Sequence, residues 1–356
     1  MNDLEYISDN NMSKEVSASS TTLSTPFFPS LKSLKIEECP NLKGWWGRTG
    51  RDLVATSSAS SPDHQQDQSH SSLPLFPLLS KLLISNCPEM TSMPLFPNLE
   101  ESLYLNNIRF KPLQETMSVS SSSLSSSSPL SKLNKMTLVS IEDIESLPAE
   151  WALYSLKVLR IWDCPRITSI FGAVRYLTSL CDLSITDCEE FDPLRDMHDD
   201  GMEWRWLNCL RYLRFEGIPK LKSLPVGLQC ISTLKQLRIA NCPNLMTLPE
   251  LTSLEYLEIY RCEPNLTSLL EISCLTSLRW LWIEGLPNLI TFPESIRNPI
   301  SLETLYIFHC PNLTTLPDDG FLKSLRNLRI WKCPQLEEKY KNKIEKDFPN
   351  LEIKWL

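Results

Sequence analysis

Cysteine is the residue type in this sequence with the widest chemical scope, because a thiolate can bind metal ions, form disulfides or act as a nucleophile. The 356-residue chain contains 12 cysteines and 4 histidines. Most of the cysteines recur at the ninth position of a repeating frame, L-x-x-L-x-I-x-x-C: Cys39, Cys87, Cys164, Cys188, Cys242, Cys262, Cys310 and Cys333. Other copies of the frame carry Ile141, Ile218 and Leu286 at this position, which favours apolar packing over chemistry. We therefore expect buried, reduced thiols rather than disulfides or metal ligands.

Motifs for catalysis or cofactor binding are not found. The sequence has no C-x-x-C pair, no G-x-x-x-x-G-K-[ST] or G-x-G-x-x-G phosphate loop, and neither H-E-x-x-H nor G-x-S-x-G. His64 and His70 lie in a polar stretch where a metal site is a remote alternative, and the acidic stretch between Asp192 and Met202 is expected to be a solvated loop. We predict no enzyme, no catalytic residue, no cofactor and no metal.

The third, fifth and seventh positions of the frame carry aromatic residues and arginines. Those that we predict to bind a partner are Arg160, Trp162, Tyr212, Arg214, Arg238, Tyr256, Tyr260, Trp280, Trp282, Tyr306, Phe308, Arg329 and Trp331. Trp, Tyr and Arg dominate interface hot spots, and contiguous exposed apolar patches mark contact surfaces. The alternative is a structural role, because aromatic residues suit strands and arginines can stack on rings.

The element that must position these residues is a strand followed by a turn. In Leu302–Pro317, apolar and polar residues alternate around Leu305 and Ile307, which predicts a strand, and Cys310-Pro311 then turns the chain. The same frame begins at Leu31, Leu79, Leu133, Leu156, Leu180, Leu210, Leu234, Leu254, Leu278, Leu302 and Leu325, with a distorted copy near Leu99.

This period and pattern are those of a leucine-rich repeat. The predicted fold class is α/β, a curved leucine-rich repeat solenoid with a parallel concave β-sheet and an irregular or short-helical convex side. In such a strand the two apolar residues, at the fourth and sixth positions, point inward. The residues at the third, fifth and seventh positions therefore line up on the concave face.

The predicted organisation has two parts. Residues 1–25 are expected to be the tail of a truncated preceding repeat, with Leu4 and Ile7 at the spacing of Leu313 and Leu316, followed by a polar linker. Residues 26–356 are expected to form the solenoid, with disordered Ser-rich insertions near 47–72 and 116–129. The C-terminal end is expected to be capped by a charged helix from Glu337 and one more strand containing Leu351 and Ile353.

Composition limits the compartment and the partners. The net charge of −8 argues against nucleic-acid binding, although aromatic residues and arginines could stack on a single strand. No apolar run reaches the roughly 18 residues that would span a bilayer, and no signal peptide is visible. The expected location is therefore cytoplasmic, without membrane contact.

The form L-x-x-L-x-I-x-x-C-P-x-L-x-x-L-P resembles the leucine-rich region of plant intracellular coiled-coil, nucleotide-binding disease resistance proteins. Leu34-Lys-Ile-Glu-Glu-Cys-Pro-Asn-Leu-Lys-Gly-Trp-Trp46 and Leu237-Arg-Ile-Ala-Asn-Cys-Pro-Asn-Leu-Met-Thr-Leu-Pro249 carry the resemblance. It implies a protein-interaction solenoid in plant defence, which recognises a pathogen effector or a guarded host protein, or holds a nucleotide-binding module inactive. The nucleotide-binding motifs themselves have no counterpart here. The alternatives are a substrate-recruiting solenoid of a ubiquitin-ligase adaptor and a non-functional receptor gene remnant.

Overall fold

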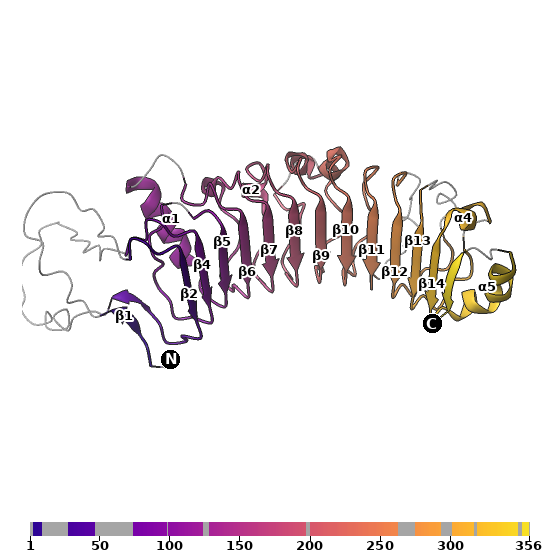
Figure 1. Ribbon diagram of the computed structural model, residues 1–356, viewed down its shortest axis with the longest axis horizontal. Helices are drawn as coiled ribbons and strands as arrows, with labels where there is room; N and C mark the ends of the chain where they lie inside the picture. Colours follow the sequence, from indigo (N-terminus) through magenta and orange to yellow (C-terminus); the bar gives the residue numbers. More distant parts are fainter. Residues whose placement is uncertain are drawn as a thin grey trace, which may run out of the picture. The chain divides into compact units, whose positions relative to one another are not determined.

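The computed structural model describes residues 3–8, 28–46, 74–97, 99–123, 128–196, 200–262, 275–292, 301–316, 319–347 and 351–355. They form two compact units. Figure 1 labels many of the helices and strands. Unit 1 comprises Met1–Leu133 with Ser140–Asp143, and unit 2 comprises Asn134–Val139 with Ile144–Leu356. No helix in these described ranges is long and apolar enough to cross a membrane.

Unit 1 contains a parallel sheet in the order β2-β4-β5 and a smaller two-stranded sheet, β1-β3. Its elements are β1 (Tyr6–Ser8), β2 (Ser33–Glu37), β3 (Gly44–Trp46), β4 (Lys81–Ser85), β5 (Ser102–Asn106) and α1 (Lys111–Ser123).

Unit 2 contains a parallel sheet in which the strands β6 to β15 follow one another in chain order. The strands are β6 (Lys135–Val139), β7 (Val158–Trp162), β8 (Asp182–Thr186), β9 (Tyr212–Glu216), β10 (Gln236–Ala240), β11 (Tyr256–Tyr260), β12 (Trp280–Glu284), β13 (Thr304–Phe308), β14 (Asn327–Trp331) and β15 (Glu352–Trp355). Short helical segments connect them: η2 (Ala149–Trp151), α2 (Phe171–Val174), η3 (Met202–Trp206), η4 (Val226–Cys230), α4 (Asp319–Ser324) and α5 (Pro334–Asp347). The predicted leucine-rich repeat solenoid is confirmed, as are the charged C-terminal helix (α5) and the last strand (β15).

The interior of unit 2 is built from equivalent residues of successive repeats. In the repeat of β13, Leu302 is 1% exposed, and Leu305, Ile307 and Cys310 are fully buried. Such a stacked apolar side chain contributes roughly 1.5–3 kcal/mol of burial. Because the side chains of a strand alternate between its two faces, this burial places positions 3, 5 and 7 on the other face of the sheet.

The residue at the eighth position, directly after the strand, lies in the left-handed region in the repeats of β2 and of β4 to β14. Asp163, Asp187 and Asn241 have φ between 51° and 53°, and Gly285 has a φ of 65°. Their backbone N–H groups donate to the next strand, as Asp187 does to the Glu216 carbonyl at 2.8 Å. Asn, Asp and Gly tolerate this conformation best, so their frequency at the eighth position has a local conformational cause.

A second line of parallel bridges runs five residues after the ninth position. Ser146 pairs with Ser169, and Thr291 pairs with Thr315. In β1, Tyr6 pairs with Gly44 in the same way. Residues 3–8 therefore take the same bridge position beside β3 that one repeat takes beside the next, whereas the rest of residues 1–25 lies outside the described residues.

The Ser-rich insertion near 116–129 differs from the prediction. Helix α1 continues to Ser123, so the expectation of disorder is wrong for residues 116–123. Leu113 and Met117 lie one helical turn apart and are 0% and 3% exposed, which anchors the helix. The Asp143 carboxylate accepts hydrogen bonds from the N–H groups of Phe110 (2.6 Å) and Lys111 (3.3 Å) at the start of α1. A carboxylate at a helix N-terminus is stabilising, and the serine-rich composition gives no sign of it. Residues 124–127, and the whole predicted insertion at 47–72 with its two histidines, lie outside the described residues.

Candidate functional site

The register of β11 to β14 aligns their outward residues in rows across the sheet. One row contains Glu258, Trp282, Tyr306 and Arg329 as successive Cα partners. A second row contains Tyr260, Glu284, Phe308 and Trp331. Neighbouring parallel strands lie about 4.8 Å apart, so large side chains in such rows must touch one another.

Aromatic side chains on these four strands form one continuous group. We call it the aromatic cluster: Tyr256, Tyr260, Trp280, Trp282, Tyr306, Phe308 and Trp331. Successive ring centroids in it are 5.2–6.2 Å apart. This is the range of offset and edge-to-face ring pairs, which contribute about 0.5–1.5 kcal/mol each beyond their burial.

Trp282 lies at the centre of the aromatic cluster. Its ring centroid is 5.2 Å from that of Phe308, 5.4 Å from that of Tyr260 and 5.5 Å from that of Tyr306. Its indole N–H donates to the Glu284 carboxylate at 3.2 Å. Trp282 is thus held by rings of the two neighbouring strands and by a hydrogen bond along its own strand, which fixes its orientation.

Two arginines stack on the aromatic cluster from opposite sides. The Arg238 guanidinium lies 4.6 Å from the Tyr260 ring centroid, and that of Arg329 lies 4.8 Å from the Tyr306 ring centroid. Arg238 also donates to the Glu258 carboxylate at 2.9 Å, and Glu258 accepts the Tyr260 hydroxyl at 2.8 Å. Burial raises the pKa of Tyr260, and its hydrogen bond to the Glu258 carboxylate raises that pKa further.

Acidic residues and a histidine complete the site, although the prediction omits them. His309 contacts the Trp331 ring at 4.7 Å, and its Nδ1 lies 3.7 Å from the Glu284 carboxylate. Glu258 and Glu284 occupy the fifth and seventh positions of their repeats. Their place on the outward face therefore follows from position alone, and the prediction missed them because it selected only aromatic residues and arginines. His309 takes the eighth position, for which strand alternation predicts no face.

The other predicted residues lie on the same face but outside the cluster. On β7, Arg160 donates to Asp182 at 2.9 Å. On β9, Arg214 donates through Nε to Glu216 at 3.0 Å, in the same strand as Tyr212. Trp162 occupies the last position of β7. The structure therefore brings together nine of the predicted residues, counting Arg238 and Arg329, and leaves these four on β7 and β9.

Strand β8 lies between β7 and β9 and therefore separates Arg160 and Trp162 from Tyr212 and Arg214. Its own outward side chains are short and polar. Ser184 is 3% exposed, and its hydroxyl has no hydrogen-bond partner among the described residues, as is also true of the Thr186 hydroxyl and the Trp162 indole N–H. Buried polar groups normally form hydrogen bonds with protein or ordered water. Strand β8 is therefore the polar part of the outward face, distinct from the aromatic cluster.

The predicted partner-binding residues are less exposed to solvent than isolated side chains on an open sheet face would be. Tyr256 is 40% exposed, and the other twelve are half-buried. The cause is mutual shielding, because the large side chains on adjacent strands lie against one another. The aromatic cluster is thus a preformed surface rather than a set of independent side chains.

The cysteines behave as the sequence predicts. All eight at the ninth position are buried thiols. Their thiols hydrogen-bond to the carbonyl two residues before, as Cys262 does to Tyr260 at 3.2 Å. Burial raises the pKa of Cys262 to about 11 and that of Cys242 to about 12. Such thiols stay protonated at neutral pH, and within the described ranges no group of three or more His, Cys, Asp or Glu side chains could hold a metal ion.

Comparison with known proteins shows a family match over half of the chain. Residues 105–283 match the family described as plant disease resistance protein RPS2-like, leucine-rich repeats. No curated protein matches the sequence significantly. The matched segment includes β6 to β11 and most of β12, and therefore Trp282 and all of the predicted residues before it.

Solved structures with similar repeats are distant. The leucine-rich repeat domain of the type III effector XCV3220 (XopL) is 26% identical over 58% of this chain, with a TM-score of 0.38; the match spans 64% of that domain's length. The Leptospira interrogans leucine-rich repeat protein LIC12759 is 22% identical over 78% of this chain and 73% of its own, with a TM-score of 0.46.

Proposed function

Because the chain belongs to the plant disease resistance RPS2-like leucine-rich repeat family, we propose that the aromatic cluster binds a protein partner in plant innate immunity. The partner would be a pathogen effector, a guarded host protein or the nucleotide-binding module of a receptor. The observation that carries the proposal is the aromatic cluster with its two stacked arginines. Leucine-rich repeats are generally protein-interaction scaffolds, and the proposed role is binding in the cytoplasm without catalysis.

The geometry of the cluster supports binding because little order has to be created when a partner docks. Binding normally costs about 0.5–1.5 kcal/mol for each flexible side chain that becomes fixed. Trp282, Tyr306 and Phe308 are already fixed by ring contacts of 5.2–5.9 Å. The cluster therefore offers aromatic area at a low entropic cost, which is typical of hot spots.

The charges around the cluster support a partner with both polar and apolar groups. Arg238 and Arg329 lie on opposite sides of the rings, while Glu258 and Glu284 lie between them in the rows. Side-chain exposure of Arg238, Glu258 and Glu284 is 32%, 24% and 21%. Partly exposed charges of both signs favour orientation and selectivity of a partner more than affinity.

Replacing Trp282 with alanine is expected to weaken partner binding by at least about 30-fold, the effect of a hot-spot residue worth 2 kcal/mol or more. The substitution removes the central ring of the cluster, which contacts rings of both rows. Affinity for candidate effectors and host proteins can be measured by calorimetry, and pathogen-dependent responses can be scored in plant tissue. The combined Trp282→Ala, Phe308→Ala and Trp331→Ala variant is expected to abolish both.

The matched control is Tyr154→Ala. Tyr154 is 49% exposed and forms an edge-to-face pair with Tyr176, but it lies between η2 and β7 rather than on a strand. The Tyr154→Ala variant should therefore bind the partner with unchanged affinity. Unaltered affinity and unaltered plant responses in the triple variant would show that the cluster has only a structural role.

A further inference from the structure

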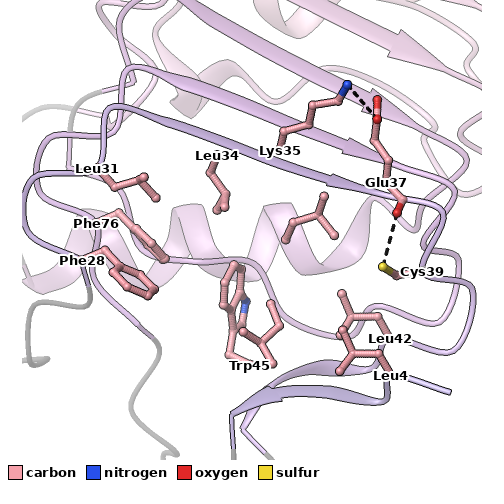
Figure 2. A pocket seen from close by; sticks show the side chains of 12 residues that line it. Leu4, Phe28, Leu31, Leu34, Lys35, Glu37, Cys39, Leu42, Trp45 and Phe76 are labelled. Carbon is pink, nitrogen blue, oxygen red and sulfur yellow. Dashed lines mark hydrogen bonds and ion pairs between the residues drawn. The ribbon is translucent and has the colours of Figure 1, made fainter. Parts of the chain in front are cut away.

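Cations at the fifth position of the repeat pair with carboxylates on β2, β7, β9 and β10. Figure 2 shows Lys35 and Glu37, two residues apart on β2, with their charged groups 2.8 Å from each other. Arg214 forms the same kind of pair on β9, with the glutamate two residues after it. Arg160 and Arg238 pair with a carboxylate on the next strand, each at 2.9 Å. The positive charge at the fifth position is thus neutralised in these four repeats.

Strand β14 departs from this pattern. Its fifth residue is Arg329, but Trp331 takes the seventh position, where β2 and β9 have glutamate. The Cα partners of Arg329 are Tyr306 on β13 and Lys354 on β15, a second basic residue. Among the described residues, no carboxylate lies within salt-bridge distance of Arg329 or of Lys332, which follows the strand. These residues therefore leave the positive charge at the β14 end of the aromatic cluster without a counter-charge.

The two cations lie on rings of the aromatic cluster. The Arg329 guanidinium is 4.8 Å from the Tyr306 ring centroid, and the Lys332 ammonium is 4.6 Å from that of Trp331. The Phe308 ring contacts both of these rings, at centroid distances of 5.9 Å and 6.1 Å. Lys332 is exposed and Arg329 is half-buried, so solvent reaches both. A partner that covers Phe308 therefore meets both cations.

The other end of the aromatic cluster holds the carboxylates. Glu258 on β11 accepts hydrogen bonds from Arg238 and from the Tyr260 hydroxyl. Glu284 on β12 accepts the Trp282 indole N–H at 3.2 Å. The rows thus run from carboxylates on β11 and β12 to cations on β14, which gives the surface a direction.

A cation on this surface loses water when a partner covers it. Leaving a covered charge without a counter-charge is strongly unfavourable. The ring below shields only one side of the cation. A carboxylate offsets the loss, because charge-assisted hydrogen bonds are stronger than neutral ones. Since the described residues supply no carboxylate to Arg329 or Lys332, the counter-charge has to come from the partner.

We propose that the partner presents an aromatic or aliphatic anchor flanked by acidic side chains, which pair with Arg329 and Lys332. The anchor lies on Trp282 and Phe308. This inference rests on the proposed function, and it adds the chemistry and the direction of the bound segment.

A single nucleic-acid strand is the other ligand that rings and cations suggest. It fits this surface poorly, because Glu258 and Glu284 lie in the rows along which its phosphates would run. The net charge of −8 also opposes a polyanion. An acidic segment with an apolar anchor needs negative charge only at the β14 end.

The test begins with random peptides displayed on phage and selected on the full chain. Peptides that also bind the Trp282→Ala variant are discarded, so those kept depend on the aromatic cluster. These peptides should be rich in Asp and Glu beside aromatic or aliphatic residues, whereas the unselected library is not. The tightest is synthesised with a fluorescent label, together with an amide version in which Asn and Gln replace its acidic residues.

Fluorescence anisotropy then compares two matched double variants. The Arg329→Gln, Lys332→Gln variant should bind the acidic peptide about tenfold more weakly or worse, the effect of losing charge-assisted hydrogen bonds. The control, Lys323→Gln, Arg326→Gln, removes two positive charges from exposed side chains on α4 and just before β14, and should bind normally. The amide peptide should lose no further affinity in the first variant, because the pairs are already absent. Circular dichroism verifies that both variants fold.

Two results would overturn the inference and leave the proposed function intact. One is a set of cluster-dependent peptides without acidic residues. The other is equal weakening of the acidic and amide peptides by Arg329→Gln, Lys332→Gln, which would show a structural role of the two cations. An oligothymidine strand that binds more tightly than the acidic peptide, and that the same variant releases, would assign the cations to phosphate and overturn the inference as well. If no selected peptide depends on Trp282, the proposed function itself fails.

Discussion

Replacing Trp204 with alanine is expected to lower the free energy of unfolding by about 3–5 kcal/mol, the range for deletion of a large buried aromatic side chain. Trp204 is 0% exposed, and its indole N–H donates to the Pro193 carbonyl at 3.1 Å. Its ring also meets that of Phe215 on β9 edge-to-face, with centroids 6.1 Å apart. The substitution removes all three interactions and leaves the Pro193 carbonyl without its donor.

The matched control is Trp206→Ala, two residues along the same 3₁₀ segment. Trp206 is 46% exposed and contacts the Arg205 guanidinium at 5.3 Å. Its loss should cost less than about 1 kcal/mol, since exposed cation–π pairs contribute about that much. Urea denaturation followed by far-ultraviolet circular dichroism avoids the change in tryptophan fluorescence. Equal losses in the two variants would contradict the buried position of Trp204.

The buried thiols are expected to make the protein much less stable in alkali. Burial raises the pKa of Cys188 and Cys242 from 9.0 to about 12 and that of Cys262 to about 11. Between pH 9 and 11 these thiols ionise in the unfolded chain but keep their protons in the folded one. The unfolded state then binds fewer protons, so stability falls as pH rises. Each thiol should remove about 2 kcal/mol over this range, at 1.36 kcal/mol per pKa unit.

Urea midpoints at pH 8, 9, 10 and 11 measure this dependence. The Cys242→Ala, Cys262→Ala double variant isolates the thiols from tyrosine and lysine ionisation. It should lose about 4 kcal/mol less than the wild type between pH 9 and 11, because two of the thiols with a raised pKa, at about 2 kcal/mol each, are gone. Ile218 and Leu286 fill the same position in other repeats, so an apolar residue is compatible with the fold. Parallel stability curves for the two proteins would contradict the raised pKa values.

The repeat fold and its inward residues could be predicted from the sequence because each repeat obeys the same local rule. The period fixes which residues stack, and alternation fixes which face they take. Leu305, Ile307 and Cys310 are examples, and all three are fully buried. The outward position of Trp282 follows from the same rule.

What could not be predicted depends on contacts between residues far apart in the sequence. The acidic stretch before Met202 gives no sign that Trp204 enters the interior, because Pro193 and Phe215 decide its position. Helix α1 depends on the Asp143 carboxylate, 32 residues after Lys111. The joining of seven rings into one cluster depends on the register of four strands, whereas the frame alone places them one repeat at a time.

The pairing of each strand in unit 2 with its immediate neighbours in the chain has a kinetic consequence. Tyr256 pairs with Trp280 and Trp280 with Thr304, and the same step recurs along the sheet. The entropy lost in closing one repeat is therefore set by the length of that repeat, rather than by the length of the chain. Folding can start at any adjoining pair of repeats and grow outward by one repeat at a time. Duplication of a repeat would lengthen the outward face without adding a slow, long-range closure step.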